Sequence, residues 1–270
     1  MLESYSQEAL EQVLAGVHDR RGWDFSSMSD LRQPVPWEYH EVVLRYLRPS
    51  DAVLDIGTGG GDRLRDLAGA FGSGLGVDMD PAMVRFATRN SAMPNLSFRV
   101  CSDRLESVPE TFDVIINRHA PFDPSAVAAH LRPGGYFITQ QVGERNMACV
   151  KAVLGQPPGP PAIQRQSFAA GELRLLAFLE YDVEYVVCDI ESLAFWLNAL
   201  DLDHADVDGQ SALASVATLN QILAGNVDER GFVTNEHRYL VVTQNAPPET
   251  DISAPPGVSR LALTRAIRPA

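Results

Sequence analysis

The chain has 270 residues, enough for one α/β domain with a full core and short for two independent enzyme domains. Its hydrophobic fraction of 45% and charged fraction of 21% are ordinary for a globular protein, and no stretch of about 18 apolar residues indicates a membrane span. The net charge of -13 disfavours a nucleic-acid partner, because such proteins gather Lys and Arg to neutralise phosphates.

Neither a signal peptide nor a metal site is expected. The N-terminal residues lack the basic start and apolar run of a signal peptide, so we expect a cytoplasmic protein. The three cysteines, Cys101, Cys149 and Cys188, are scattered and form no C-x-x-C pair or Cys/His spacing. Since an odd number also makes a poor disulfide framework, we interpret them as buried thiols.

Residues 1–50 predict a helical leader ahead of the first strand. Apolar residues recur at helical spacing between Leu10 and Val17, and the same spacing resumes from Trp37 to Leu47 after a loop that contains Pro34. Because this leader precedes the sheet, it can fold back over a ligand.

From residue 51 the chain alternates strands and helices, which predicts a parallel sheet with helices on both faces. The helices are expected at 63–70, after Asp80-Pro81 and after Asp123-Pro124, where an Asp cap precedes the proline favoured at a first helical position. Five strands are expected, at 52–56, 74–78, 96–101, 112–117 and 136–142.

The first of these strands ends in Asp55 and leads into a glycine-rich loop, Gly57-Thr-Gly-Gly-Gly61. A loop with so few side chains lets the backbone approach a ligand closely. The spacing departs from the dinucleotide fingerprint G-x-G-x-x-G, and the Asp62 carboxylate would repel a pyrophosphate. Asp55 is instead an acceptor suited to a cationic ligand group.

Four segments together carry a family resemblance: V-L-D-I-G-T-G-G-G from Val53, G-V-D-M-D-P-A-M-V from Gly76, F-D-V-I-I-N-R-H from Phe112 and L-R-P-G-G-Y-F from Leu131. In this order and spacing, residues 37 to 143 resemble the class I S-adenosylmethionine-dependent methyltransferases. The cofactor of that family carries an ammonium and a sulfonium and has no phosphate. The resemblance therefore implies S-adenosyl-L-methionine as cofactor and a Rossmann-like fold.

The resemblance also implies cofactor roles for particular residues. Asp55 and the loop residues Gly57, Thr58, Gly59 and Gly61 would hold the methionine part. The remaining roles fall at the ends of later strands: Asp78 for the ribose, Met79 and Asp103 for the adenine, and Asn117 for the carbonyl floor below the methyl group.

The second half of the chain completes the fold that we expect. A proline-rich loop at 155–167 and a helix at 172–179 precede strands at 182–190 and 237–243. Residues 191–235, with helical stretches at 192–200 and 212–223, are predicted to form a lid insertion, and residues 246–270 a proline-rich tail. The prediction is thus a single domain over residues 1–245, with a seven-stranded, mostly parallel sheet.

Candidates for the chemistry lie at the strand ends. His119 follows the fourth strand and is the first candidate for a general base, against the alternative of a structural histidine; His40 and His237 are weaker candidates. Trp37 and Tyr39 line the acceptor pocket or simply pack the leader. Gln140 and Gln141 alternate across the strand, so only one faces the pocket, and Trp196 is either a pocket wall or part of the core of the lid.

We therefore predict a methyltransferase that acts on a small-molecule acceptor, such as one of secondary metabolism, as a monomer or homodimer. Two alternatives stay open. An RNA methyltransferase of the ribosomal RNA type would share the same core, and a non-catalytic partner protein would keep the cofactor motifs without turnover. Methyl transfer from a sulfonium needs alignment and exclusion of water more than a protein nucleophile, so the sequence indicates the donor more clearly than the acceptor.

Overall fold

The structure is a computed structural model that describes residues 8, 11–13, 28–156, 158, 163–165, 173–200 and 216–245. Within these residues the chain divides into two compact units. Unit 1 comprises the described parts of Met1–Val35, Glu144–Pro160 and Asp182–His237, and unit 2 those of Pro36–Gly143, Pro161–Tyr181 and Arg238–Ala270. The predicted tail, most of the helix predicted between Leu10 and Val17, and residues 201–215 of the insertion lie outside the described residues.

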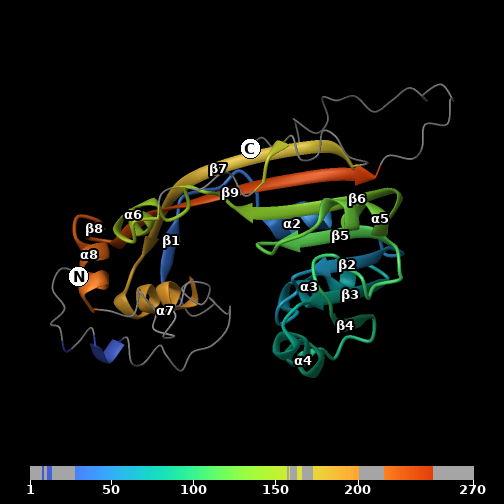
Figure 1. Cartoon of the computed structure of the whole chain (residues 1–270), viewed down its shortest axis with the longest axis horizontal. Coiled ribbons are helices and arrows are strands. Elements are labelled where there is room, and N and C mark those ends of the chain that lie inside the picture. Colours follow the sequence, from blue (N-terminus) through green and yellow to red (C-terminus); the bar gives the residue numbers. More distant parts are fainter. Residues whose placement is uncertain are drawn as a thin grey trace. The chain divides into compact units, whose positions relative to one another are not determined.

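Unit 2 contains the parallel sheet that the sequence predicts (Figure 1). Its strands run in the order β7-β9-β6-β5-β2-β3-β4. The neighbours from β6 to β4 are parallel, whereas β9 is antiparallel to β6. The strand bounds are β2 (Ala52–Ile56), β3 (Ser73–Asp78), β4 (Leu96–Val100), β5 (Phe112–Arg118), β6 (Leu131–Val142), β7 (Leu173–Val187) and β9 (Gly231–Asn245), and the last two strands contribute residues to both units.

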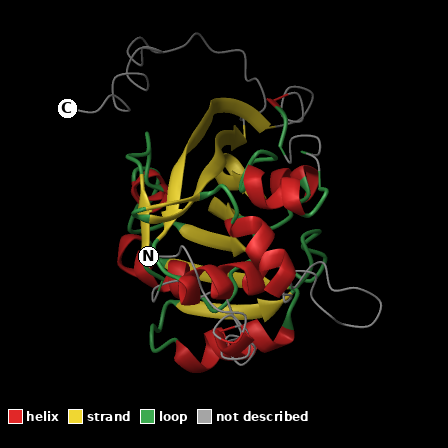
Figure 2. Ribbon diagram, turned by 90° about the vertical axis from the view of Figure 1, so that its left-hand side faces the viewer, coloured by secondary structure: helices red, strands yellow, loops and turns green. Residues whose placement is uncertain are grey.

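Helices connect β2 to β3, β3 to β4 and β5 to β6 (Figure 2), and the connection from β4 to β5 is a loop. The β2-to-β3 and β3-to-β4 crossovers advance across the sheet in the direction opposite to the β5-to-β6 crossover. Because such crossovers are right-handed, the first two crossover helices lie on one face and the third on the other. The helices of unit 2 are α2 (Tyr39–Leu44), α3 (Asp62–Leu67) with the 3₁₀ turn η1 (Ala68–Ala70), α4 (Pro81–Asn90) and α5 (Pro124–His130).

The predicted caps form as the sequence indicates. The Asp80 side chain accepts a hydrogen bond from the Ala82 amide at 2.7 Å, and Asp123 accepts from the Ser125 amide at 2.8 Å, each with a proline at the first helical position. Between the helices and the sheet lies a core that includes Leu54, Ile115 and Phe137, none of which is exposed. The packed sheet and these caps fix where each strand ends, and so where the loops that follow begin.

Unit 1 has a core of its own. The strand β1 (Asp30–Arg32) pairs antiparallel with residues 185–187 of β7, and β8 (Val227–Asp228) pairs with the start of β9. The helices α6 (Ala148–Val153), α7 (Ile190–Leu200) and α8 (Val216–Leu223) pack a cluster that includes Ile190, Leu219 and Phe232. No helix in the described ranges of either unit is long and apolar enough to span a membrane.

Two predictions of secondary structure are wrong, and one helix was missed. The described chain has nine strands rather than seven, because the short strands β1 and β8 had no recognisable pattern. The helix predicted at 172–179 is strand from Leu173 onward: its apolar residues suit a helix locally, but pairing and burial in the sheet override that propensity. The helix α6 was not predicted, since it is only six residues long.

Gly76, in the middle of β3, offers a test of this packing. A Cβ there would lie 2.7 Å from both Phe98 Cδ1 and Thr58 Oγ1, whereas a Cβ on Gly69 would meet nothing within 4 Å. We predict that Gly76→Ala lowers the free energy of unfolding by about 1 to 3 kcal/mol through overpacking, and that the control Gly69→Ala changes it by less than about 0.5 kcal/mol. Urea denaturation measures both, and equal midpoints for the two variants would contradict the packing described.

Candidate cofactor and methyl-acceptor site

The carboxyl ends of four parallel strands in unit 2 bring the candidate cofactor residues to one edge of the sheet. Ile56 pairs in register with Val77 on one side and with Asn117 on the other, and Asp78 pairs with Val100. The residues that follow these positions therefore begin side by side, at the edge where open α/β sheets bind ligands.

The glycine loop has a backbone that other residues could not adopt without strain. Gly57, Gly59 and Gly61 all have positive φ angles, of 73°, 54° and 76°. A Cβ on Gly57 would lie 2.2 Å from the Ala120 Cβ, so this position also needs glycine for space. The Gly57 and Thr58 amides each donate to the Val77 carbonyl at 2.9 Å, which joins the loop to β3. The loop is thus a fixed backbone cradle.

Asp78 holds the loop from the adjacent strand end. Its Oδ2 accepts a hydrogen bond from the Gly59 amide at 2.9 Å, and its Oδ1 accepts one from the Asp80 amide at 2.9 Å. Each carboxylate oxygen keeps a second lone pair for a further donor. Asp78 can therefore order the cradle and accept two hydroxyl groups of a ligand at the same time.

Asp55 is a buried carboxylate beneath the loop. It is 6% exposed, and no cation forms an ion pair with it in the part of the chain that the structure describes. Burial raises the pKa of Asp55 to about 7; the Thr58 hydroxyl opposes this rise, and the negative charge of Asp78 adds to it. A ligand cation next to Asp55 would relieve the cost of burying its charge.

The other cofactor candidates differ in their surroundings. Thr58 is buried beside Asp55, whereas Met79 is 64% exposed, directly after β3. Asp103 is half-buried in the turn that follows β4. The adenine contacts of Met79 and Asp103 stay predictions.

The Asn117 side chain makes three hydrogen bonds within the protein. Its Nδ2 donates to the Ile56 carbonyl at 3.0 Å, and its Oδ1 accepts from Thr139 Oγ1 at 2.8 Å and from Gln141 Nε2 at 2.6 Å. This network ties β2, β5 and β6 together at the edge of the sheet. Any ligand contact by Asn117 therefore has to come from its remaining hydrogen-bonding capacity.

The leader residues Trp37 and Tyr39 are anchored on the same strand ends. The Tyr39 hydroxyl lies 3.0 Å from the Asn117 carbonyl oxygen and 3.2 Å from that of Ile138. Burial, followed by the charge of Asp55, raises the pKa of Tyr39, so its hydroxyl stays protonated and donates to these carbonyls. The Trp37 ring packs on Tyr181 with centroids 4.6 Å apart. Both side chains are buried, and His40, next along the helix, is half-buried.

Gln140 and His119 also lie at this edge of the sheet. Trp37 Nε1 donates to Gln140 Oε1 at 2.9 Å, and Gln140 Nε2 lies 3.2 Å from His119 Nε2. Gln141 instead bonds to the Asn117 side chain and the Ala120 carbonyl. The sequence candidates Trp37, Gln140 and His119 thus form one chain of contacts within unit 2.

Two other sequence candidates, His237 and Trp196, belong to unit 1. His237 is fully buried, and its Nδ1 accepts a hydrogen bond from the Arg145 amide at 3.1 Å. Trp196 packs against the core of unit 1 and lies 5.5 Å from the Tyr185 ring, centroid to centroid. The contacts of both residues are those of packing residues within unit 1.

Some supporting residues were missed from the sequence. Phe98 and Gly76 pack under the glycine loop, because a Cβ on Gly61 or Gly76 would lie 2.7 Å from Phe98. A glycine inside the strand 74–78 was the available signal, since glycine in a strand often marks a close approach of other groups. The Thr139 contact with Asn117 had no comparable signal.

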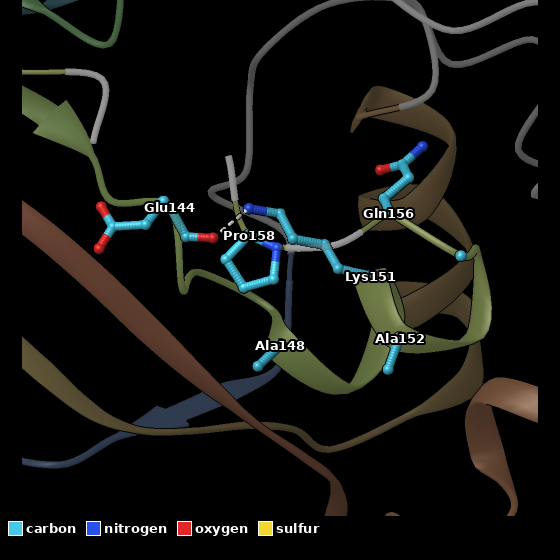
Figure 3. Close-up of a pocket in the computed structure, with 7 residues that line it drawn as sticks. Glu144, Ala148, Lys151, Ala152, Gln156 and Pro158 are labelled. Carbon is cyan, nitrogen blue, oxygen red and sulfur yellow. Dashed lines mark hydrogen bonds between the residues drawn. The ribbon is translucent and has the colours of Figure 1, made fainter. Parts of the chain in front are cut away.

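Unit 1 also contains a hollow of about 340 Å³ beside α6 (Figure 3). Lys151 Nζ donates to the Glu144 carbonyl at 2.8 Å there. The hollow is lined by Glu144, Ala148, Lys151, Ala152, Gly155, Gln156 and Pro158. The lining side chains include no nucleophile paired with a base.

Comparison with known proteins gives the class of this site. A family model described as a methyltransferase domain matches residues 53–135, the stretch from the first strand of unit 2 into β6. The chain is 29% identical over 145 residues to the ribosomal protein L11 methyltransferase of Thermus thermophilus, covering 51% of this chain and 56% of that protein. It is 39% identical over 88 residues to the release factor glutamine methyltransferase of Rhodospirillum rubrum, covering 30% and 26%. The chain thus spans about half, or less, of these relatives.

Solved structures agree on the fold. A protein of unknown function from Deinococcus radiodurans superposes with a TM-score of 0.56 at 17% identity, covering 88% of this chain and 98% of that one. The YcgJ protein of Bacillus subtilis gives 0.52 at 15%, covering 78% and 99%. Residues 53–135 therefore form a class I S-adenosylmethionine-dependent methyltransferase domain. The methyl donor of this class is S-adenosyl-L-methionine, and a buried carboxylate, a glycine cradle and Asp78 suit its ammonium and its ribose.

The raised pKa of Asp55 gives a prediction about cofactor binding. A ligand cation favours the carboxylate, so S-adenosylmethionine binding should release a proton below about pH 7 and weaken as the pH falls. Asp55→Asn should weaken binding by about tenfold or more, as a lost buried charge contact implies. Asp51→Asn, just before β2, should leave the affinity unchanged. Calorimetry in buffers of different ionisation enthalpy measures both effects, and pH-independent binding would contradict the role of Asp55.

The raised pKa of Asp55 also predicts how the stability of the cofactor-free protein changes with pH. The folded pKa of Asp55 lies above its value of 3.8 in the unfolded chain, so stability is lost as the pH rises from about 4 to about 7. Removing the charge by Asp55→Asn should therefore stabilise the free protein by about 1 to 3 kcal/mol at pH 8, since each pKa unit is worth about 1.4 kcal/mol. The gain should vanish near pH 4. Urea titrations at both pH values check it, and a loss of stability at pH 8 would show that Asp55 is stabilised by a partner.

Proposed function

We propose that the protein transfers a methyl group from S-adenosylmethionine to a small-molecule acceptor. The observation that carries the proposal is Asp55, a buried carboxylate without a cation among the described residues, next to a glycine loop that Asp78 fastens. A ligand with an ammonium and a ribose is complementary to these groups. The match of residues 53–135 to the methyltransferase family supports the same cofactor.

The residues of the chain would contribute mainly alignment and exclusion of water. S-adenosylmethionine supplies a methyl group on a sulfonium, which is already an activated leaving group. Asp55 and Asp78 would orient the donor, while the buried leader residues Trp37 and Tyr39 close off the strand ends on which they are anchored. His119 and Gln140 lie at the same edge and are the proposed acceptor-side residues.

The small-molecule acceptor is supported by the acidic balance of the chain and by the insertion at residues 191–235. A net charge of -13 opposes RNA binding, since phosphate neutralisation supplies most non-specific affinity for nucleic acid. In the class I methyltransferases, an insertion before the last strand commonly takes part in acceptor binding.

A protein acceptor is the second candidate. It is favoured by the names of the relatives, which are methyltransferases of ribosomal protein L11 and of release factor. These relatives match over at most 145 residues, so their acceptor-binding parts need not correspond to those of this chain.

Transfer from S-adenosylmethionine with a tritiated methyl group distinguishes the candidates. The protein is incubated separately with a metabolite extract, a total protein extract and total RNA, with Asp55→Asn as the matched control. We predict enzyme-dependent label that passes a small-molecule filter and that falls by about tenfold or more with the variant at limiting S-adenosylmethionine. Label in protease-sensitive or RNase-sensitive material would replace the small-molecule proposal, and absence of label in every extract despite cofactor binding would indicate a non-catalytic partner protein.

A further inference from the structure

Three side chains at the acceptor edge form a directed chain of hydrogen bonds. Trp37 Nε1 lies 2.9 Å from Gln140 Oε1, and Gln140 Nε2 lies 3.2 Å from His119 Nε2. Trp37 and Gln140 are buried, whereas His119, the last member of this series of hydrogen bonds, is exposed. The buried pair therefore supports a side chain that a ligand can reach.

The direction of these bonds follows from the chemistry of the groups. An indole nitrogen can only donate, so Trp37 requires the oxygen of the Gln140 amide to face it. The Gln140 nitrogen must then point to His119, and an amide nitrogen can only donate. His119 Nε2 is consequently an acceptor without a proton, and the proton of the neutral ring lies on Nδ1.

The backbone of His119 is also held by Gln140. The His119 amide donates to the Gln140 carbonyl at 2.9 Å, and His119 has a φ angle of 60°. A positive φ is costly for a residue other than glycine and persists only where the surroundings enforce it, which happens often at functional sites. Gln140 thus fixes both the backbone position and the ring of His119.

We propose that Gln140 is a positioning residue that keeps His119 as the neutral Nδ1–H tautomer, so that His119 donates a hydrogen bond to an oxygen of the bound molecule and does not remove a proton. This inference rests on the proposed function, because it assigns the ligand at that same edge. It also revises the hypothesis of a general base: Nε2, the basic nitrogen, is already occupied by Gln140.

The surrounding charge favours an anionic oxygen. Loss of hydration at the ring, followed by the positive charges of Arg118, Arg238 and Arg63, lowers the pKa of His119, although the residue as a whole is exposed. These arginines add to the effect of lost hydration and attract negative charge in a chain that is acidic overall. A carboxylate fits this neighbourhood, whether it belongs to the methionine part of the cofactor or to the methyl acceptor.

Nitrogen-15 NMR of the cofactor-free protein, with labelled histidine, tests the tautomer directly. The His119 signals are assigned by their loss in His119→Ala. We expect the wild-type ring to be protonated on Nδ1 and to stay neutral at pH 6.5, where an ordinary histidine is half protonated. An Nε2–H tautomer in the wild-type protein would overturn the proposal.

The variant Gln140→Glu separates positioning from packing. Its carboxylate can still accept from Trp37, but it can only accept from His119, so the proton should move to Nε2 and the pKa of the imidazole should rise. Gln244→Glu adds the same charge to β9 of unit 2 without a contact to His119 and should leave the tautomer unchanged. An unchanged tautomer in Gln140→Glu, or an equal change in both variants, would contradict the role of Gln140.

Calorimetry then identifies the source of the oxygen. If the oxygen belongs to the cofactor, Gln140→Glu should weaken S-adenosylmethionine binding about tenfold, the effect of one charge-assisted hydrogen bond, at a pH above the raised imidazole pKa of the variant, where Nδ1 carries no proton. Binding of decarboxylated S-adenosylmethionine should be unaffected. If it belongs to the acceptor, both cofactors should bind as they bind to the wild-type protein. Equal weakening of both would contradict a carboxylate at His119. If the wild-type protein binds neither cofactor, the proposed function itself is wrong.

Discussion

The cost of burying the Asp55 carboxylate is the constraint on which the rest of the site depends. Its burial raises its pKa to about 7, and no described residue forms an ion pair with it. A protein can retain such a group where a ligand supplies the missing charge. The glycine loop lies directly after this strand, and Asp78 fastens it from the next strand. The buried charge therefore makes the free protein less stable, and it makes the site complementary to a cationic cofactor.

The two sides of the site are built differently. The donor side is mostly backbone, because the positive φ angles of the glycine loop and the register of β2, β3 and β5 determine it. The proposed acceptor side consists of side chains whose orientation depends on hydrogen-bond direction, from Trp37 through Gln140 to His119. The backbone of the loop is fixed by local geometry, whereas the contacts from Trp37 to His119 depend on which side chains the chain supplies at these three positions.

The sequence predicted the strands and helix caps around the glycine loop well, because glycines, capping residues and strand-end acids act locally. The strands from β2 to β6 and the caps Asp80 and Asp123 lie where their patterns indicate. The strand β7 was mistaken for a helix over residues 173–179, since only long-range pairing overrides the local helical spacing. The hydrogen bonds from Trp37 through Gln140 to His119 could not be predicted from the sequence either, because Trp37 and Gln140 lie 103 positions apart in the chain.

A structure of the protein with S-adenosylhomocysteine tests the central claim most directly. The account predicts that the ligand amino group lies beside Asp55, the ribose hydroxyls bond to Asp78, and the homocysteine part follows the backbone of the Gly57 to Gly61 loop. A ligand bound elsewhere, or bound at this loop with Asp55 still distant from any cation, would contradict it.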